Sequence, residues 1–126
     1  MKLDLQKYLE EFPQCDPFES YVWGKRLVHR KRIRQYIRDG KLCTEPADPS
    51  YSRAKHEKRI AYLAVRGWSD AIEIDVGCPG LPGGFVDFPT LDGNHRIAAA
   101  LFRGDPYIEA NCSGDIEFFE QFRWTE

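Results

Sequence analysis

The sequence predicts a single α/β (α+β) domain, in which helices surround a small mixed β-sheet. Residues 71–76 and 107–112 alternate apolar and polar side chains as strands do, and each segment follows a helical pattern that ends at a glycine. The 126 residues are 42% hydrophobic and 30% charged, which suits one globular domain with its own core but not two. We therefore expect one compact unit, with a basic helical extension over residues 1–52 and the α/β domain over residues 53–126.

The N-terminal extension is expected to be largely helical. Residues 4–12 carry apolar side chains at helical spacing, and Pro13 ends that segment. Residues 24–39 carry apolar side chains among many basic ones, so we expect a second helical segment that ends at Gly40. Residues 43–52 contain two prolines and small polar residues, which favours a loop.

The first part of the α/β domain follows a helix–strand order. Ser52 is placed to cap a helix over residues 53–65, and Gly67 is placed to close it. Residues 71–76 are then expected to form a strand. The glycines and prolines of residues 77–84 predict a loop with several turns.

In the second part of the domain, strands and helices alternate. Residues 85–91 predict a strand that a proline interrupts, and residues 95–102 predict a helix rich in alanine. Residues 107–112 form the third predicted strand, and a last helix starts at residues 114–115. The side chains expected on the inner side of this last helix are Ile116, Phe119 and Phe122.

Charge and cysteine content narrow the class of protein. The net charge of −2 is unevenly spread, because residues 1–63 carry 14 Lys and Arg against 9 Asp and Glu, and residues 64–126 carry 4 against 11. No apolar run could cross a bilayer, and the first residues lack the apolar core of a signal peptide, so we expect a cytoplasmic protein without a membrane partner. The four cysteines form no CxxC pair, which predicts free thiols rather than a zinc site.

The clearest candidate site is the turn at Asp92-Gly93-Asn94-His95-Arg96, which runs directly into the alanine-rich helix. The start of a helix exposes unpaired amide groups and the positive end of the helix dipole. Gly93 allows the backbone to approach a ligand, and Arg96 can hold a phosphate through two parallel hydrogen bonds. The turn therefore predicts a phosphate-binding site, and the alternative is an ordinary helix start capped by Asp92.

The order of elements around this turn resembles a known family. From about Arg59 to Ser113 the chain reads helix, Gly67, strand, loop, strand, Asp-Gly-Asn-His-Arg, helix, Gly104 and strand. This order resembles the ParB/sulfiredoxin-like nucleotide-binding domain of ParB-type partition proteins, sulfiredoxin and the free-serine kinases. The resemblance implies that nucleotide phosphates bind at the Gly-x-x-Arg turn, here Gly93, Asn94, His95 and Arg96.

The same resemblance limits the function. Sulfiredoxin has its catalytic cysteine within the turn, where this chain has Asn94, so sulfinic acid reductase activity is not expected. Partition proteins have a long DNA-binding region after this domain, and only about a dozen residues follow Ser113 here, so a full partition protein is not expected either.

Within the turn, each side chain has a functional and a structural interpretation. Arg96 either binds phosphate or forms a salt bridge with Asp92 or a C-terminal carboxylate. His95 either donates to phosphate and acts as a catalytic acid–base group, or is a buried structural histidine. Asp92 either acts in catalysis by holding Mg²⁺ beside the phosphates, or caps the helix. Asn94 is a turn residue that also contacts the ligand.

The helix over residues 53–65 adds further candidates. The cations at the start of this helix are expected to meet the outer phosphates, with a solvated helix face as the alternative. These cations are Arg53, Lys55, His56 and Arg59. Glu57 is the only carboxylate on this helix, so it is a candidate general base, with a surface salt bridge as the alternative.

The basic segment over residues 25–41 is a candidate surface for nucleic acid or a protein partner. The alternative is a solvated helix that packs on the acidic half of the chain. The basic residues assigned to this surface are Lys25, Arg26, Arg30, Lys31, Arg34 and Arg38.

Two functions follow. The first is binding of a nucleotide, ATP/ADP or CTP, or of another phosphorylated small ligand, with Mg²⁺ as a candidate cofactor; if the chain is an enzyme, it is a Mg-dependent NTPase or small-molecule kinase. The second is a non-catalytic module that contacts nucleic acid or a protein through the basic segment, in a plasmid, phage or defence role that rests on analogy.

Overall fold

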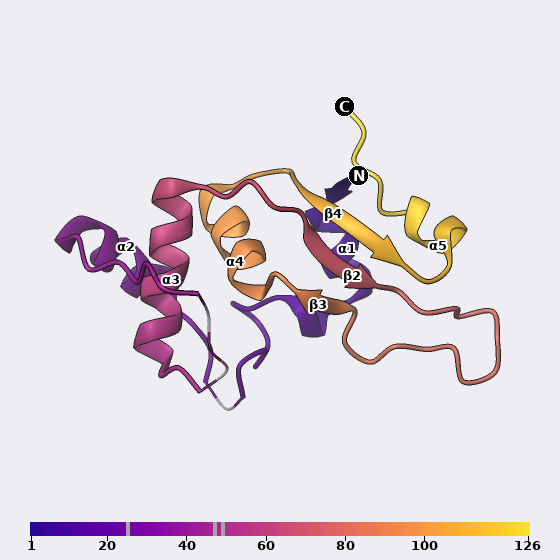
Figure 1. Cartoon of the computed structure of the whole chain (residues 1–126), viewed down its shortest axis with the longest axis horizontal. Helices are drawn as coiled ribbons and strands as arrows, with labels where there is room; N and C mark the ends of the chain where they lie inside the picture. Colours follow the sequence, from indigo (N-terminus) through magenta and orange to yellow (C-terminus); the bar gives the residue numbers. More distant parts are fainter. Residues whose placement is uncertain (25, 47, 49) are drawn as a thin grey trace.

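The computed structural model describes residues 1–24, 26–46, 48 and 50–126. It shows the expected mixed α+β fold, with helices around a four-stranded mixed sheet (Figure 1). The elements in chain order are β1 (Lys2–Asp4), α1 (Leu5–Glu11), η1 (Pro13–Cys15), α2 (Arg30–Asp39), α3 (Arg53–Arg66), β2 (Ile72–Asp75), β3 (Thr90–Asp92), α4 (Asn94–Arg103), β4 (Tyr107–Ser113) and α5 (Ile116–Glu120).

The sheet has the order β1-β4-β2-β3. β4 runs parallel to β2 and antiparallel to β1, while β3 runs antiparallel to β2. α4 is the crossover that lets β4 return beside β2, as parallel strands require. β1 was not expected from the sequence, and through it the first residues of the chain form an edge of the sheet rather than a separate extension.

The local signals at most helix ends are confirmed. The side chain of Ser52 accepts a hydrogen bond of 3.2 Å from the Lys55 amide at the start of α3, and Gly67 follows the last turn. Gly40 and Gly104 end α2 and α4 in the left-handed conformation that glycine adopts without strain. α2 begins only at Arg30, six residues later than expected.

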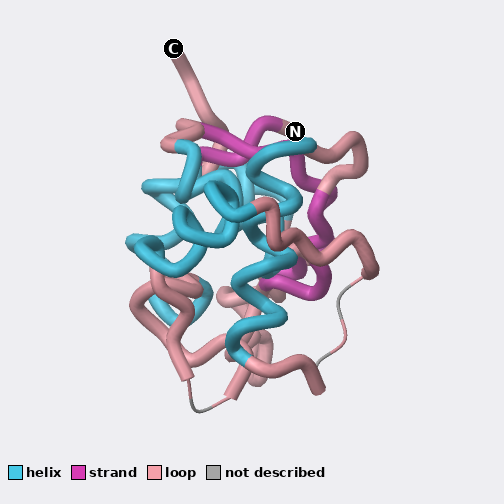
Figure 2. The backbone as a smooth tube through the Cα atoms, turned by 90° about the vertical axis from the view of Figure 1, so that its left-hand side faces the viewer, coloured by secondary structure: helices cyan, strands magenta, loops and turns pink. Residues whose placement is uncertain are grey.

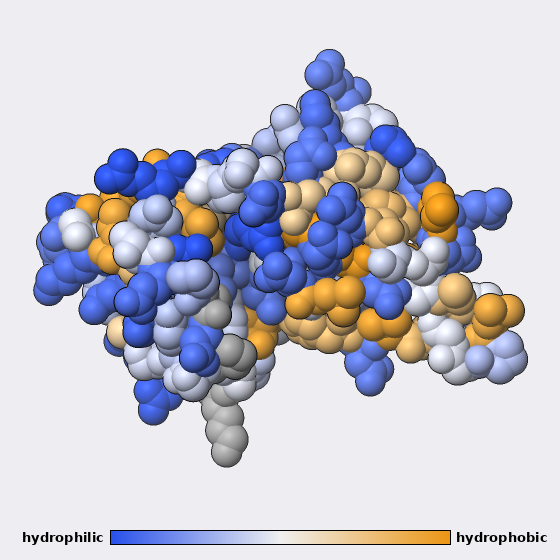
Figure 3. Space-filling view, viewed as in Figure 1, coloured by the Kyte–Doolittle hydropathy of each residue, from blue (hydrophilic) through white to orange (hydrophobic). Residues whose placement is uncertain are grey.

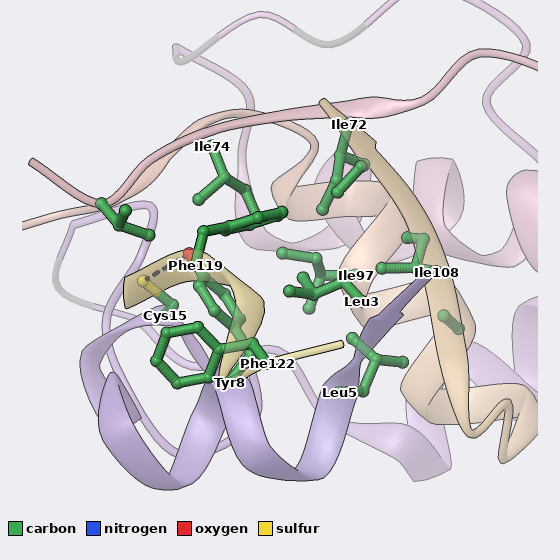
Figure 4. Close-up of a cluster of buried hydrophobic side chains, with 13 residues drawn as sticks. Leu3, Leu5, Tyr8, Cys15, Ile72, Ile74, Ile97, Ile108, Phe119 and Phe122 are labelled. Carbon is green, nitrogen blue, oxygen red and sulfur yellow. Dashed lines mark hydrogen bonds between the residues drawn. The ribbon is translucent and has the colours of Figure 1, made fainter. Parts of the chain in front are cut away.

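Two cores lie on either side of α4. The first core lies between one face of the sheet and helices α1, α4 and α5; Figure 4 shows Tyr8, Phe119 and Phe122 within it. The second core joins α4 to α3 and α2, which lie side by side beyond it (Figures 1 and 2). Ile97 faces the first core, and Ala98 faces the second. Because the side chain of Ala98 is small, α4 can approach α3 closely.

Two predictions about the second half are corrected. The strand expected over residues 85–91 is wrong in its extent, because the structure has only β3 there, after Pro89. Proline has no amide proton to donate to a neighbouring strand. Phe85, which was expected in the strand, is 79% exposed. Figure 3 shows apolar side chains over this β2–β3 loop, at the right of the view. Ile116 on α5 is 70% exposed, although Phe119 and Phe122 are buried as expected, because the short helix presents only one side to the core.

None of the helices in the described part of the chain is long and apolar enough to cross a membrane.

Candidate functional site

The predicted turn lies at the wall of a cleft of about 860 Å³, which residues of α3, of β2 and β3, and of the start of α4 also line. Gly93, Asn94, His95 and Arg96 all line it, so the four residues assigned to a phosphate site are brought together. Aromatic rings line other parts of the wall. These rings belong to Trp23, Tyr62 and Trp68.

Gly93 rather than Asp92 is the N-cap of α4, and no side chain caps this helix. Gly93 has a φ of 132°, which side chains with a Cβ rarely adopt, and a Cβ at this position would lie 2.4 Å from Cγ2 of Ile72. The expectation that Asp92 caps the helix is therefore wrong, because the turn carries its carboxylate away from the first amides. The first amides of α4 have no capping side chain, and the residues that carry them line the cleft.

Arg96 is held by the protein itself. Its Nη1 donates to the backbone carbonyls of Asp70 at 2.9 Å and Ala71 at 3.1 Å, and its Nη2 lies 3.1 Å from the Asp92 carboxylate. The salt bridge to Asp92 was the structural alternative, and it is present. Arg96 thus fastens the entry of β2 to the start of α4, and a ligand would have to compete for the guanidinium with three partners.

His95 forms a pair with His56, which the sequence placed only among the cations expected near the outer phosphates. Nε2 of His95 lies 2.7 Å from Nδ1 of His56 on α3. The ring of Trp23 stacks on that of His56, with 4.6 Å between centroids, and lies tilted against that of His95 at 4.4 Å. Burial, the neighbouring His56 and then Arg59 lower the pKa of His95 to about 3. His95 is 8% exposed, so it is a buried histidine, which was its structural interpretation. It also lines the wall of the cleft.

Asn94 also lines the cleft, and its side-chain oxygen is buried without a partner in the described residues. Buried polar atoms normally have a hydrogen-bond partner, and leaving one out costs about 1–3 kcal/mol. A hydroxyl or amino group of a ligand would satisfy this oxygen.

Of the α3 cations Lys55 and Arg59, only Arg59 lies at the cleft. Arg59 lines the cleft, but its Nη1 donates to the carbonyls of Cys43 and Thr44 at 3.4 and 3.1 Å. Lys55 does not line the cleft, because it turns toward Glu45, 3.9 Å away. It also lies over the ring of Tyr51.

Glu57 is fully buried and does not line the cleft, so neither the general base nor the surface salt bridge describes it. Its Oε2 accepts a hydrogen bond of 2.8 Å from the amide of His29, the N-cap of α2. Burial raises the pKa of this carboxyl, opposed by the His29 amide and by nearby Arg32 and Arg53. Glu57 therefore joins α3 to the start of α2. The position of Glu57 in the sequence does not show whether its side chain is buried or exposed.

The cleft carries more acidic than basic side chains. Its carboxylates are those of Asp48, Asp70, Glu73 and Asp92, and its cationic groups are those of Arg59 and Arg96. Glu73 and Asp92 are direct partners in the β2–β3 ladder, which places their side chains next to each other on one face. Both carboxylates already have a partner, because Asp92 pairs with Arg96 at 3.1 Å and Glu73 accepts a hydrogen bond of 2.9 Å from Nδ2 of Asn111. The described residues contain no group of three or more His, Cys, Asp or Glu that could hold a metal alone.

The basic segment is only partly free for a partner. Arg30 donates to the carbonyl of Leu101 at 3.3 Å and stacks on Phe18. Lys25 lies outside the described residues, and Arg26 is exposed in the loop before α2. On α2, the exposed cations that share one face at helical spacing are Lys31, Arg34 and Arg38.

No family model, curated protein or solved structure matches this chain. The resemblance to the ParB/sulfiredoxin-like domain therefore stays a prediction.

Proposed function

We propose that the cleft at the start of α4 binds a nucleotide, ATP/ADP or CTP, or another phosphorylated small molecule. The observation that carries this proposal is that Gly93, Asn94, His95 and Arg96 all line one cleft of about 860 Å³. This volume is in the range of small-molecule sites, about 300–1,000 Å³. The uncapped amides of α4 are donors for phosphate oxygens, and the aromatic rings of the wall offer surfaces for a base.

The electrostatics of the cleft make a divalent cation part of the proposal. Four carboxylates against two engaged arginines would repel a bare polyphosphate. Mg²⁺ is commonly held by one or two carboxylates together with phosphate oxygens, and the neighbours Glu73 and Asp92 suit that role. Asp92 is 76% exposed at its side chain and so can turn to a cation. Mg²⁺ would neutralise charge on the phosphates and on the wall at once.

Nucleotide hydrolysis or phosphoryl transfer is the chemistry that such a site would carry, because positioning and charge neutralisation do most of the work in these reactions. Two of the candidate groups are poorly suited to proton transfer. Glu57 does not reach the cleft, and His95 is neutral at pH 7 and only weakly basic. Binding is therefore the core of the proposal, and turnover is a separate question.

A thermal-shift panel with ATP, ADP, CTP and GTP, each with and without Mg²⁺, tests this function. The variant Asp92→Asn removes the exposed carboxylate, and Glu19→Gln is the matched control, because Glu19 is exposed and does not line the cleft. Ligand at about a hundred times its Kd adds about 2.7 kcal/mol of stability. We expect a Mg²⁺-dependent rise in Tm for one nucleotide that Asp92→Asn abolishes and Glu19→Gln keeps. A wild-type Tm unchanged by every nucleotide would exclude the proposal.

The exposed face of α2 supports a second candidate function, binding of nucleic acid. Lys31, Arg34 and Arg38 lie on one face of a helix at the end of the molecule opposite the sheet (Figure 1). Phosphate contacts of this kind weaken steeply with salt, with a slope of log K on log salt of about −0.9 per contact for duplex DNA. Fluorescence anisotropy of a labelled duplex should show that slope, and Lys31→Gln with Arg34→Gln should reduce it by about two. Salt-independent binding, or no binding at about 50 mM salt, would remove this candidate.

A further inference from the structure

A second, smaller pocket lies at the start of α3, separate from the cleft. Its volume is about 240 Å³, and its wall includes Arg26, Ser52, Arg53 and His56. Trp23 lines both this pocket and the cleft and so divides them. No carboxylate lines the small pocket, whereas four line the cleft, so the two have opposite charge.

The donors of this pocket come from three sources. α3 has 14 residues, and its first amides have no acceptor within the helix; Ser52 accepts only from the amide of Lys55. The guanidinium groups of Arg26 and Arg53 form no ion pair with any residue that the structure describes. Glu57 lies near Arg53 but on the side of α3 that faces the start of α2.

An independent observation points to a ligand here. His56 is 2% exposed, and its Nε2 is buried with no hydrogen-bond partner in the part of the chain that is described. Its Nδ1 is turned to His95, which lines the cleft, so Nε2 lies on the other side of the ring. His56 lines the small pocket and not the cleft. His56 thus brings a buried, unpartnered nitrogen to the pocket that Arg26 and Arg53 also line.

We propose that this pocket binds a phosphate dianion, either inorganic phosphate or the phosphate group of a small ester. When His95 donates from Nε2 to Nδ1 of His56, the proton of the neutral His56 is on Nε2, which then donates to a phosphate oxygen. The arginines and the first amides of α3 supply the remaining donors. The proposed ligand contacts residues of α3 and of the loop before α2 and needs no Mg²⁺, while His95 at the start of α4 only sets the position of the proton on His56.

The test is an NMR titration of the full chain at constant ionic strength, with inorganic phosphate in one arm and methyl phosphate in the other. We expect saturable shifts in the amides of Arg53 and Ala54 and in the ¹⁵N signal of Nε2 of His56. Arg53→Gln and Arg26→Gln should each weaken binding about tenfold, since each removes one charge-assisted hydrogen bond. Arg26→Gln changes an exposed loop residue, so it tests the site even if Arg53→Gln does not fold.

Arg66→Gln is the matched control, because it removes the same charge from the exposed last turn of α3, at the other end of the helix, and should change the affinity less than about twofold. Binding in the inorganic arm alone would define a site for free phosphate, and binding in both arms a site for phosphate esters. The proposal is overturned if phosphate leaves Nε2 of His56 unshifted, or if Arg66→Gln and Arg53→Gln weaken binding equally. Asp92→Asn should leave this titration unchanged, which separates its outcome from that of the nucleotide cleft.

Discussion

Nε2 of His95 and Nδ1 of His56 lie 2.7 Å apart in the interior between α4 and α3, under the ring of Trp23. This single contact joins the wall of the cleft to the pocket at the start of α3. One imidazole must donate and the other accept, so the contact requires that the pair is not doubly protonated.

Stability should fall as the pH is lowered through the titration of this pair. Burial lowers the pKa of both imidazoles, that of His95 to about 3, whereas an unfolded histidine titrates near 6.5. The unfolded state therefore binds more protons below about pH 6.5, and the free energy of unfolding should drop by about 1.4 kcal/mol per pH unit for His95 alone. Urea unfolding between pH 7 and pH 4 measures this slope.

The variant His95→Asn should flatten that pH dependence, although it also lowers stability at pH 7. The exposed His29, on the N-terminal side of α2, gives the control variant His29→Asn, which should keep the slope. An unchanged slope in His95→Asn would contradict the assignment of the acid sensitivity to the pair.

Gly93→Ala should be strongly destabilising. The new Cβ would lie 2.4 Å from Cγ2 of Ile72, and the φ of 132° is unfavourable for alanine, so we expect a loss of about 2–4 kcal/mol in the free energy of unfolding. Gly104→Ala is the control for the backbone alone, because Gly104 has a φ of 80° and open space around it; it should cost about 1 kcal/mol. Denaturant unfolding compares the two, and equal losses would contradict the close contact with Ile72.

Arg96→Lys should lower stability even in the absence of ligand. A lysine cannot donate to the carbonyls of Asp70 and Ala71 and bind Asp92 at the same time, so we expect a loss of about 1–3 kcal/mol. Asp92→Asn removes only the exposed ion pair and should cost less than about 1 kcal/mol. Unfolding curves for both variants measure this difference. A fully stable Arg96→Lys variant would show that Arg96 is free to serve a ligand.

Leu3→Ala should destabilise the whole domain rather than a separate extension. Leu3 is fully buried between β4 and the aromatic side chains of the first core, so its truncation should cost about 2–5 kcal/mol. Leu91→Ala is the control, since Leu91 is 62% exposed on β3. A single cooperative transition shifted to lower urea is expected for Leu3→Ala. An early, separate transition would show that the N-terminal residues unfold on their own.

The helix ends were predictable because each depends on a few neighbouring residues. Ser52 caps α3 through the amide three residues on, and Gly40, Gly67 and Gly104 end their helices through their own backbone conformations. The glycine of the candidate site follows the same logic. Only glycine accepts the φ of 132° that the turn into α4 requires.

The short strands were harder to predict from sequence. β1 has only three residues, which carry no alternating pattern long enough to recognise, and it exists because β4 offers an open edge. β3 is equally short. The expected strand started at residue 85, but pairing begins only after Pro89, which has no amide proton to donate. In both cases the partner strand, distant in sequence, decides where pairing begins.

By itself, the sequence determined the α+β class, the glycines that end α2, α3 and α4, and the glycine turn that starts α4, because propensities, caps and turns act over a few residues. Only the tertiary structure decided what the polar side chains do. It buried Glu57 beneath α2, used Arg96 to fasten β2, and set His56 against His95, 39 residues away in sequence. Burial and partnership depend on which elements pack together, and that packing is a property of the whole chain.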